Sequence, residues 1–281
     1  MATKGGVFRK PNPWTTAIVA VIVAVFFSFP YVVMVISSLK TRAEITQQPP
    51  DYLPTSPQWV NYLDVWGYQA VDPGQALLSS IVVALGATLL VLLVATPASY
   101  YVARYRFPGR MAFLLLVLIT QMLQPTVLAI GLYVEFVQWK GYLVWLALIL
   151  INAAFNLSFA VWIMQSFFAS VPKEIDEAAM LDGLGRLQTM FKVSLPLVWP
   201  GIVTAIIFVF VNTWNEYAAA FVLRNDKLQT LPVAIPSFLG QYVKEWHFMF
   251  ATAVVAMIPV IILFSMIEKR LIGGLTAGAV K

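Results

Sequence analysis

The sequence Pro172-Lys-Glu-Ile-Asp-Glu-Ala-Ala-Met-Leu-Asp-Gly183, continuing to Val193-Ser-Leu-Pro196, separates two long apolar segments and carries four acidic residues within nine positions. Proline suits the first turn of a helix, and carboxylates suit its positive N-terminal end. Gly183 or Gly185 can supply the left-handed residue that ends such a helix. The pattern predicts a short polar helix at about 172–182, a surface that must lie in water.

The segments on either side of this helix are suited to lipid. Hydrophobic residues make up 60% of the 281 residues, charged residues 11%, and the mean hydropathy is +0.81. Six runs reach the roughly 20 residues that a helix needs to cross a bilayer. They lie at about 14–38, 76–98, 111–135, 142–168, 198–222 and 248–267, with a loop at 169–197 between the fourth and fifth. We therefore expect an all-α membrane protein with six transmembrane helices in a single membrane domain, 1–281.

The distribution of basic residues predicts the orientation. Twelve of the eighteen lysines and arginines fall on the side that holds both ends of the chain and the loop 169–197. Because cytoplasmic loops carry the excess of positive charge, both termini and the acidic helix are expected in the cytoplasm. The bases are spread over loops flanking the membrane and do not form one patch, so the net charge of +5 does not indicate nucleic acid.

Several chemical roles find no support in the residues. Cysteine is absent, and His247 is the only histidine, so no set of metal ligands is expected. No Walker-type Gly-x-x-x-x-Gly-Lys-Ser/Thr sequence and no catalytic triad spacing occur. We predict a protein that is not itself an enzyme and that holds no cofactor.

The polar loop is longer than a connector requires. Glu-Ala-Ala at 177–179, Gly183, Val193 and Leu195-Pro196 resemble, in type, order and spacing, the signature of permease subunits of bacterial ATP-driven importers. The resemblance covers essentially the whole chain and points to the carbohydrate branch, the relatives of the inner permease of the maltose importer. That branch is carried by Pro54-Thr-Ser-Pro57, Tyr101-Val-Ala-Arg-Tyr-Arg-Phe-Pro-Gly-Arg110, Trp214-Asn-Glu-Tyr217 and Gly274-Leu-Thr-Ala-Gly-Ala-Val-Lys281.

The resemblance implies a type I importer permease fold in a bacterial or archaeal cell membrane. It implies a second permease subunit, two ATPase subunits that carry ATP and Mg, and an extracytoplasmic binding protein that delivers a sugar, oligosaccharide or polyol. It also implies that the polar loop docks into the ATPase. The residues assigned to that coupling contact are Glu174, Glu177, Ala178, Ala179, Asp182, Gly183, Leu195 and Pro196.

A transport path should place polar side chains at helical spacing on apolar spans. The candidates are Gln121, Gln124, Asn152, Asn156, Asn212, Asn215 and Glu216. Amides in membrane helices also hydrogen-bond between neighbouring helices as packing contacts, and that alternative stays open for each pair.

The second long outer loop, 224–246, contains Pro232, Pro236 and Gly240. Its composition allows it either to cap the bundle or to reach an external partner, and the family resemblance implies contact with the binding protein.

Three other functions remain possible at this point. An importer permease for a glycerophosphodiester or amino acid would share the coupling signature. An ion-driven secondary carrier would require intramembrane ionisable residues and two related halves, whereas Glu216 stands nearly alone. A membrane scaffold would explain the polar helix without a path.

Overall fold

The computed structural model describes residues 12–68, 71–120, 131, 142–224, 229–240 and 244–278, with the side chains of α14 described as far as residue 267. Within those ranges all the regular elements are helices and no strand occurs, apart from an isolated bridge between Leu239 and Lys244. The helices are α1 (Pro13–Ser38), α2 (Arg42–Thr46), α3 (Asn61–Asp64), the 3₁₀ turn η1 (Val65–Gly67), α4 (Pro73–Arg104), α5 (Arg110–Thr120), α7 (Tyr142–Ser170), α8 (Lys173–Leu181), α9 (Arg186–Thr189), the π-helical turn η2 (Met190–Ser194), α10 (Leu195–Leu197), α11 (Trp199–Trp214), α12 (Ala218–Leu223), α13 (Leu231–Ser237) and α14 (Trp246–Gly278).

Four of the described helices are long and apolar enough to cross a membrane: α1, α4, α7 and α14. A fifth candidate is the bent pair 186–197 and 199–214, whose two parts meet at 82°. The predicted span 111–135 is described only up to residue 120 and at residue 131, so the count of six spans and the side of the termini stay predictions.

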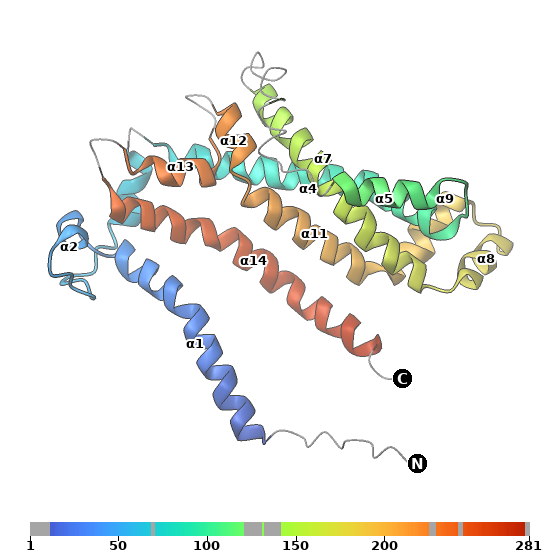
Figure 1. Cartoon of the computed structure of the whole chain (residues 1–281), viewed down its shortest axis with the longest axis horizontal. Coiled ribbons are helices and arrows are strands. Elements are labelled where there is room, and N and C mark those ends of the chain that lie inside the picture. The colour runs from blue at the N-terminus through green and yellow to red at the C-terminus, as the bar shows by residue number, and fades with distance from the viewer. Residues whose placement is uncertain are drawn as a thin grey trace.

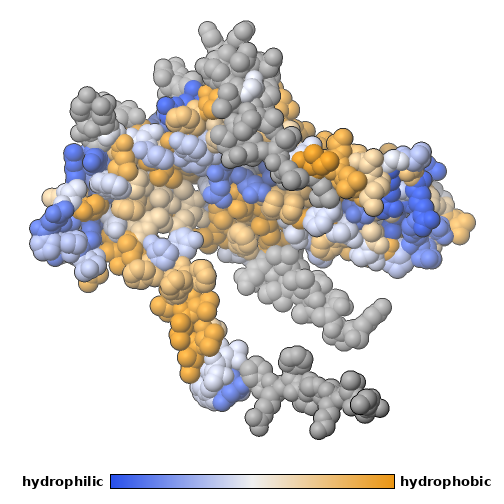
Figure 2. All heavy atoms as spheres, viewed as in Figure 1, coloured by the Kyte–Doolittle hydropathy of each residue, from blue (hydrophilic) through white to orange (hydrophobic). Residues whose placement is uncertain are grey.

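The molecule is elongated, with its polar residues at the two ends. In Figure 1, α2 lies at one end of the long axis, α8 and α9 lie at the other, and α4 runs between them. Figure 2 shows hydrophilic surface at both ends and hydrophobic surface between them, including most of the described part of α1. We call the two polar ends the α8 end and the α2 end. This banding is the one expected of a protein that crosses lipid.

The core lies where α4, α7 and α11 pack together. Buried residues of these helices and of η2 form one apolar cluster, which includes Val91, Ala95, Ala160, Met164, Phe168, Met190, Ala205 and Val209. Small residues bring the helix backbones close. A Cβ atom at Gly86 would lie 2.6 Å from Ile149 Cδ1, and one at Gly201 would overlap the ring of Phe167. Close approach through small residues is the usual way in which helices associate inside membranes.

Helix α1 stands outside this core. None of its most apolar 18-residue window is buried, compared with 44% for α7 and 39% for α4. It meets the rest of the chain along α14. An apolar surface of this extent is suited to lipid or to another membrane helix.

The predicted fifth span, 198–222, is not one helix. Helix α11 ends at Trp214, and a new helix, α12, begins at Ala218. The carboxylate of Glu216 accepts hydrogen bonds from the backbone N–H groups of Ala219 and Ala220, at 2.7 and 3.1 Å. This carboxylate satisfies donors that a helix start leaves unpaired, which stabilises the break in an otherwise continuous apolar run.

Candidate coupling site

Helix α8 closely matches the predicted polar helix. Pro172 is its N-cap, Glu174 and Asp176 lie in its first turn, and Asp182 is its C-cap. Gly183 adopts the left-handed conformation, with φ +91°. The N–H groups of Gly183 and Leu184 donate to the carbonyls of Met180 and Ala179, both at 3.1 Å. These two bonds form a Schellman motif, which requires a residue such as glycine at the left-handed position.

The solvent-facing side of α8 carries charge and apolar side chains together. Four predicted contact residues, Glu174, Glu177, Ala178 and Asp182, are exposed. Leu181 is 89% exposed and Met180 is 40% exposed. Helix α8 therefore presents a free face on which carboxylates flank protruding hydrophobic groups, at a polar end of the molecule.

Ala179 is not on the exposed face of α8, where a contact residue is expected. It is buried inside the chain, whereas Ala178 next to it is exposed. The reason is helical periodicity, because Ala179 lies three residues after Asp176, which is also buried, and the two share the inward face of α8. Of the two alanines assigned to the coupling contact, only Ala178 is available to a partner on the free face.

Asp176 is the functional candidate that sequence reasoning missed. Its carboxylate is enclosed by donors from other segments, and its side chain is 6% exposed. Arg104 Nε lies 2.7 Å from Oδ2, Tyr100 donates its hydroxyl hydrogen to Oδ2 at 3.0 Å, and Ser194 donates its hydroxyl hydrogen to Oδ1 at 2.6 Å. Arg104 also donates from Nη1 to the carbonyl oxygen of Val171 at 2.6 Å. No local sequence pattern separates Asp176 from the three exposed acids of α8, because its burial depends on Arg104 and Tyr100 of α4.

The segment after α8 leads back into the bundle. A capping hydrogen bond runs from the N–H of Gly185 to the side-chain oxygen of Gln188, 3.2 Å away. The turn η2 then precedes α10, where Leu195 is half-buried and Pro196 is exposed. The chain bends at Val198, between α10 and α11. Pro200, near the start of α11, has no N–H to continue the hydrogen bonding of α10, which accounts for the bend there.

The predicted path residues do not gather in one place. Asn152 and Asn156 are buried, and their amides donate to backbone carbonyls one turn earlier, at 2.9 and 2.8 Å. Asn156 also lies 3.5 Å from the hydroxyl of Thr213 on α11. Two of these contacts lie within α7, and the third joins α7 to α11. Gln121 and Gln124 lie outside the described residues.

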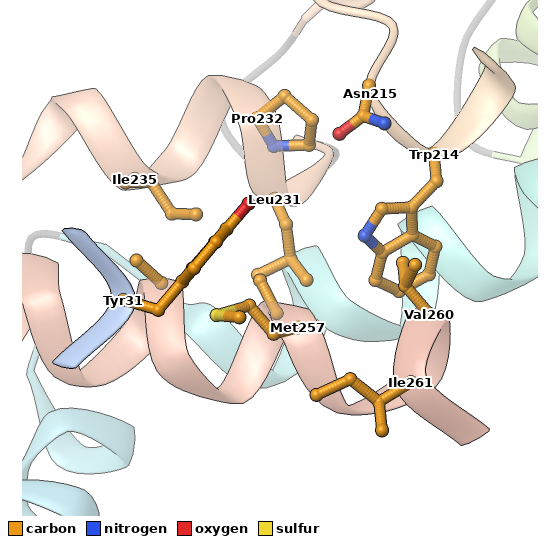
Figure 3. Close-up of a pocket in the computed structure, with 11 residues that line it drawn as sticks. Tyr31, Trp214, Asn215, Leu231, Pro232, Ile235, Met257, Val260 and Ile261 are labelled. Carbon is orange, nitrogen blue, oxygen red and sulfur yellow. The ribbon is translucent and has the colours of Figure 1, made fainter. Parts of the chain in front are cut away.

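The remaining path candidates line two separate hollows. Asn212 is exposed and borders a cavity of about 300 Å³ with Phe208 and Phe264. Asn215 borders a cavity of about 410 Å³ between α1, α11, α13 and α14. In Figure 3 the rings of Tyr31 and Trp214 lie on opposite sides of that second cavity, with Asn215 at its edge. Glu216, by contrast, is engaged in starting α12.

The described part of the loop 224–246 packs onto the bundle. Within α13, Leu231, Val233 and Ala234 are buried, and Phe238 follows at 1% exposure. The N–H of Leu231 donates to Ser80 Oγ of α4 at 2.8 Å. Of the predicted contact residues, Pro236 and Gly240 are exposed and Pro232 is half-buried. This segment caps the bundle and still exposes a face at the α2 end.

No group of three or more histidine, cysteine or acidic side chains that could hold a metal ion occurs among the described residues. His247 Nδ1 lies 3.5 Å from Glu245 Oε2.

Residues 95–275 match the family described as the binding-protein-dependent transport system inner membrane component. The chain belongs to this family. Relatives that align over most of their length support the assignment. The permease is 35% identical over 255 residues, 90% of this chain and 88% of the relative, to a sulfoquinovosyl glycerol transport system permease protein of Agrobacterium fabrum. It is 31% identical over 93% of this chain and 94% of the relative to a trehalose/maltose transport system permease protein of Thermococcus litoralis.

The solved structures agree on the fold. A chain of a bacterial ABC transporter involved in the import of the acidic polysaccharide alginate superposes with a TM-score of 0.73. The two chains are 21% identical, and the superposition covers 91% of this chain and 94% of that one. The permease is thus an inner-membrane transport component with the fold of an ABC importer permease, and its relatives are permease subunits rather than catalytic ones.

Proposed function

We propose that this permease imports a sugar, oligosaccharide or polyol, and that α8 couples it to an ATPase on the cytoplasmic side. The observation that carries the coupling role is the free face of α8, where Glu177 and Asp182 are exposed beside Leu181. Carboxylates on such a face suit basic groups of a partner, and the apolar knobs suit a groove. The face is anchored to the bundle through Asp176.

The solute class is supported by the relatives. The names of the Agrobacterium and Thermococcus proteins specify sulfoquinovosyl glycerol, trehalose and maltose. An extracytoplasmic binding protein delivers the solute, and a second permease completes the path. Two ATPase subunits bind ATP and Mg and hydrolyse the ATP. Import of a glycerophosphodiester or an amino acid is not favoured, and neither is an ion-driven carrier. The two relatives named above are permease proteins of transport systems for sugars or sugar derivatives.

The coupling role is tested by ATP hydrolysis of the complete complex in lipid discs, with and without the solute-loaded binding protein. Gly183→Asp places a side chain at φ +91°, where L residues are strained, and distorts the end of α8. We expect the stimulated rate of hydrolysis to fall by at least about tenfold. A rise of about 1.4 kcal/mol in the activation free energy is enough for that change. Glu177→Ala should lower it less.

Gly185→Asp is the matched control. Gly185 has φ −71° and precedes α9 as its N-cap, a position that aspartate favours. This variant should hydrolyse ATP like the wild type. Full stimulation in both Gly183→Asp and Glu177→Ala, with the subunits assembled, would refute the coupling role of α8. Testing the binding protein with disaccharides, oligosaccharides and polyols, and with an amino acid as the contrasting solute, would decide the solute class.

A further inference from the structure

The carboxylate of Asp176 joins segments that are far apart in the sequence. Arg104 and Tyr100 lie one turn apart at the end of α4, Ser194 ends η2 just before α10, and Val171 precedes α8. All contact either Asp176 or its partner Arg104. A single buried ion pair therefore connects α8, α4 and the start of the path into α11.

Burial sets the strength of this connection. The side chains of Arg104 and Asp176 are each 6% exposed. Removing one partner of a buried pair leaves an uncompensated charge, so separation of the pair is strongly opposed. Hydrogen bonds to an ionised group are also stronger and more directional than neutral ones.

The geometry of the contacts fixes the orientation of the Asp176 carboxylate. Oδ1 is held by Ser194 and Oδ2 by Tyr100 and Arg104, so the carboxylate plane is fixed from two sides. A slide of α8 along α4 would break charge-assisted hydrogen bonds, whereas apolar contacts alone would permit it. A second contact supports the same joint, because the Arg186 guanidinium of α9 lies over the ring of Tyr105, 5.4 Å from its centroid.

We infer that the Arg104–Asp176 pair is the rigid joint through which a displacement of α8 moves α4 and α11 together. The inference rests on the proposed coupling role of α8. Arg104, Asp176, Tyr100 and Ser194 are positioning residues: they face inward, away from the free face of α8. Their function is to prevent α8 from moving without the spans.

The test is the number of solute molecules imported per ATP hydrolysed, measured on the complete complex in proteoliposomes. This ratio does not depend on how much complex assembles. In Asp176→Asn and Arg104→Met, α8 still docks but its movement is lost at the joint. The ratio should fall by at least about tenfold while ATP hydrolysis persists, because the loss of one partner of a buried pair destabilises the joint strongly. Arg106→Met is the matched control, because Arg106 is exposed two residues away, and its ratio should equal that of the wild type.

Two further variants test the inference if Asp176→Asn or Arg104→Met fails to assemble. Arg104→Met with Asp176→Leu removes both charges, which restores packing without the ionic joint. Assembly should recover while the ratio stays low. Tyr100→Phe should lower the ratio modestly, and Tyr101→Phe, at an exposed neighbour, should not.

A wild-type ratio in assembled Asp176→Asn or in the double variant would overturn the inference and leave only a structural role for the pair. Failure of the proposed function gives a different result, because the wild-type complex itself would then show no ATP hydrolysis dependent on the binding protein.

Discussion

The α8 end and the α2 end each contain an ion pair, but the two pairs differ in burial. At the α8 end, Arg104 and Asp176 are each 6% exposed, and Asp176 also accepts hydrogen bonds from Tyr100 of α4 and Ser194 of η2. At the α2 end, Arg42 Nη1 lies 3.0 Å from Glu245 Oε1, with the arginine side chain 57% exposed and the glutamate side chain 10% exposed, so only the cation of this pair is solvated. An enclosed pair fixes the segments that it joins, whereas a solvated pair can exchange its partner for water. The α8 end is therefore the more rigid attachment.

Two carboxylates show the same contrast. Asp176 relies on a cation and two hydroxyl groups inside the protein. Glu44 at the α2 end is solvated, and hydrogen bonds from the backbone N–H of Thr41 and from Thr55 lower its pKa to about 2. It thus stays ionised without a cation and holds only its own loop. Asp176 is thus held by side chains that are distant in the sequence, whereas Glu44 is held by nearby backbone groups.

The largest effect is expected from Arg104→Met, which leaves Asp176 buried without its cation. We expect the free energy of unfolding to fall by about 3–5 kcal/mol, because a charge would remain uncompensated. Equilibrium unfolding in mixed micelles measures it. Adding Asp176→Leu should recover most of the loss. A single variant as stable as the wild type would show that the pair contributes little and that the two ends do not differ as described.

The sequence alone predicted α8 well and its anchor not at all. Proline at 172 and glycine at 183 gave the bounds of the helix to within one residue, because caps are local features. Which of four acids turns inward depends on packing against Arg104, 72 positions earlier, which no local pattern records. The break at Glu216 was missed for a related reason. Its apolar surroundings look continuous, and only the bonds to Ala219 and Ala220 show that the carboxylate starts a new helix.

A smaller effect is expected from Ser194→Ala. This change removes one hydroxyl donor to Asp176 and leaves the ion pair in place. The loss should be about 1.5–3 kcal/mol, the usual contribution of a hydrogen bond to a charged group. The same unfolding measurement applies, with Ser166→Ala as control. Ser166 is exposed, and its hydroxyl donates only to the carbonyl of Ile163 within α7. Equal losses in the two variants would mean that Ser194 does not support the buried carboxylate.

The smallest effect is expected at the α2 end, from Arg42→Ala. The Arg42 side chain is 57% exposed, so water reaches its contact with Glu245, whose 10% exposed carboxylate keeps His247 as a neighbour 3.5 Å away. The free energy of unfolding should change by less than about 1 kcal/mol, the range of solvated ion pairs.

The difference between Arg42→Ala and the wild type should shrink further as salt rises from about 0.05 to about 0.5 M, because solvated charges are screened over about a Debye length. The loss in Arg104→Met should be nearly insensitive to the same salt change, since its charge is enclosed. Unfolding curves at the two salt concentrations measure both responses. A large, salt-independent loss in Arg42→Ala would show that both ends are fixed by buried charge, and the contrast between them would no longer hold.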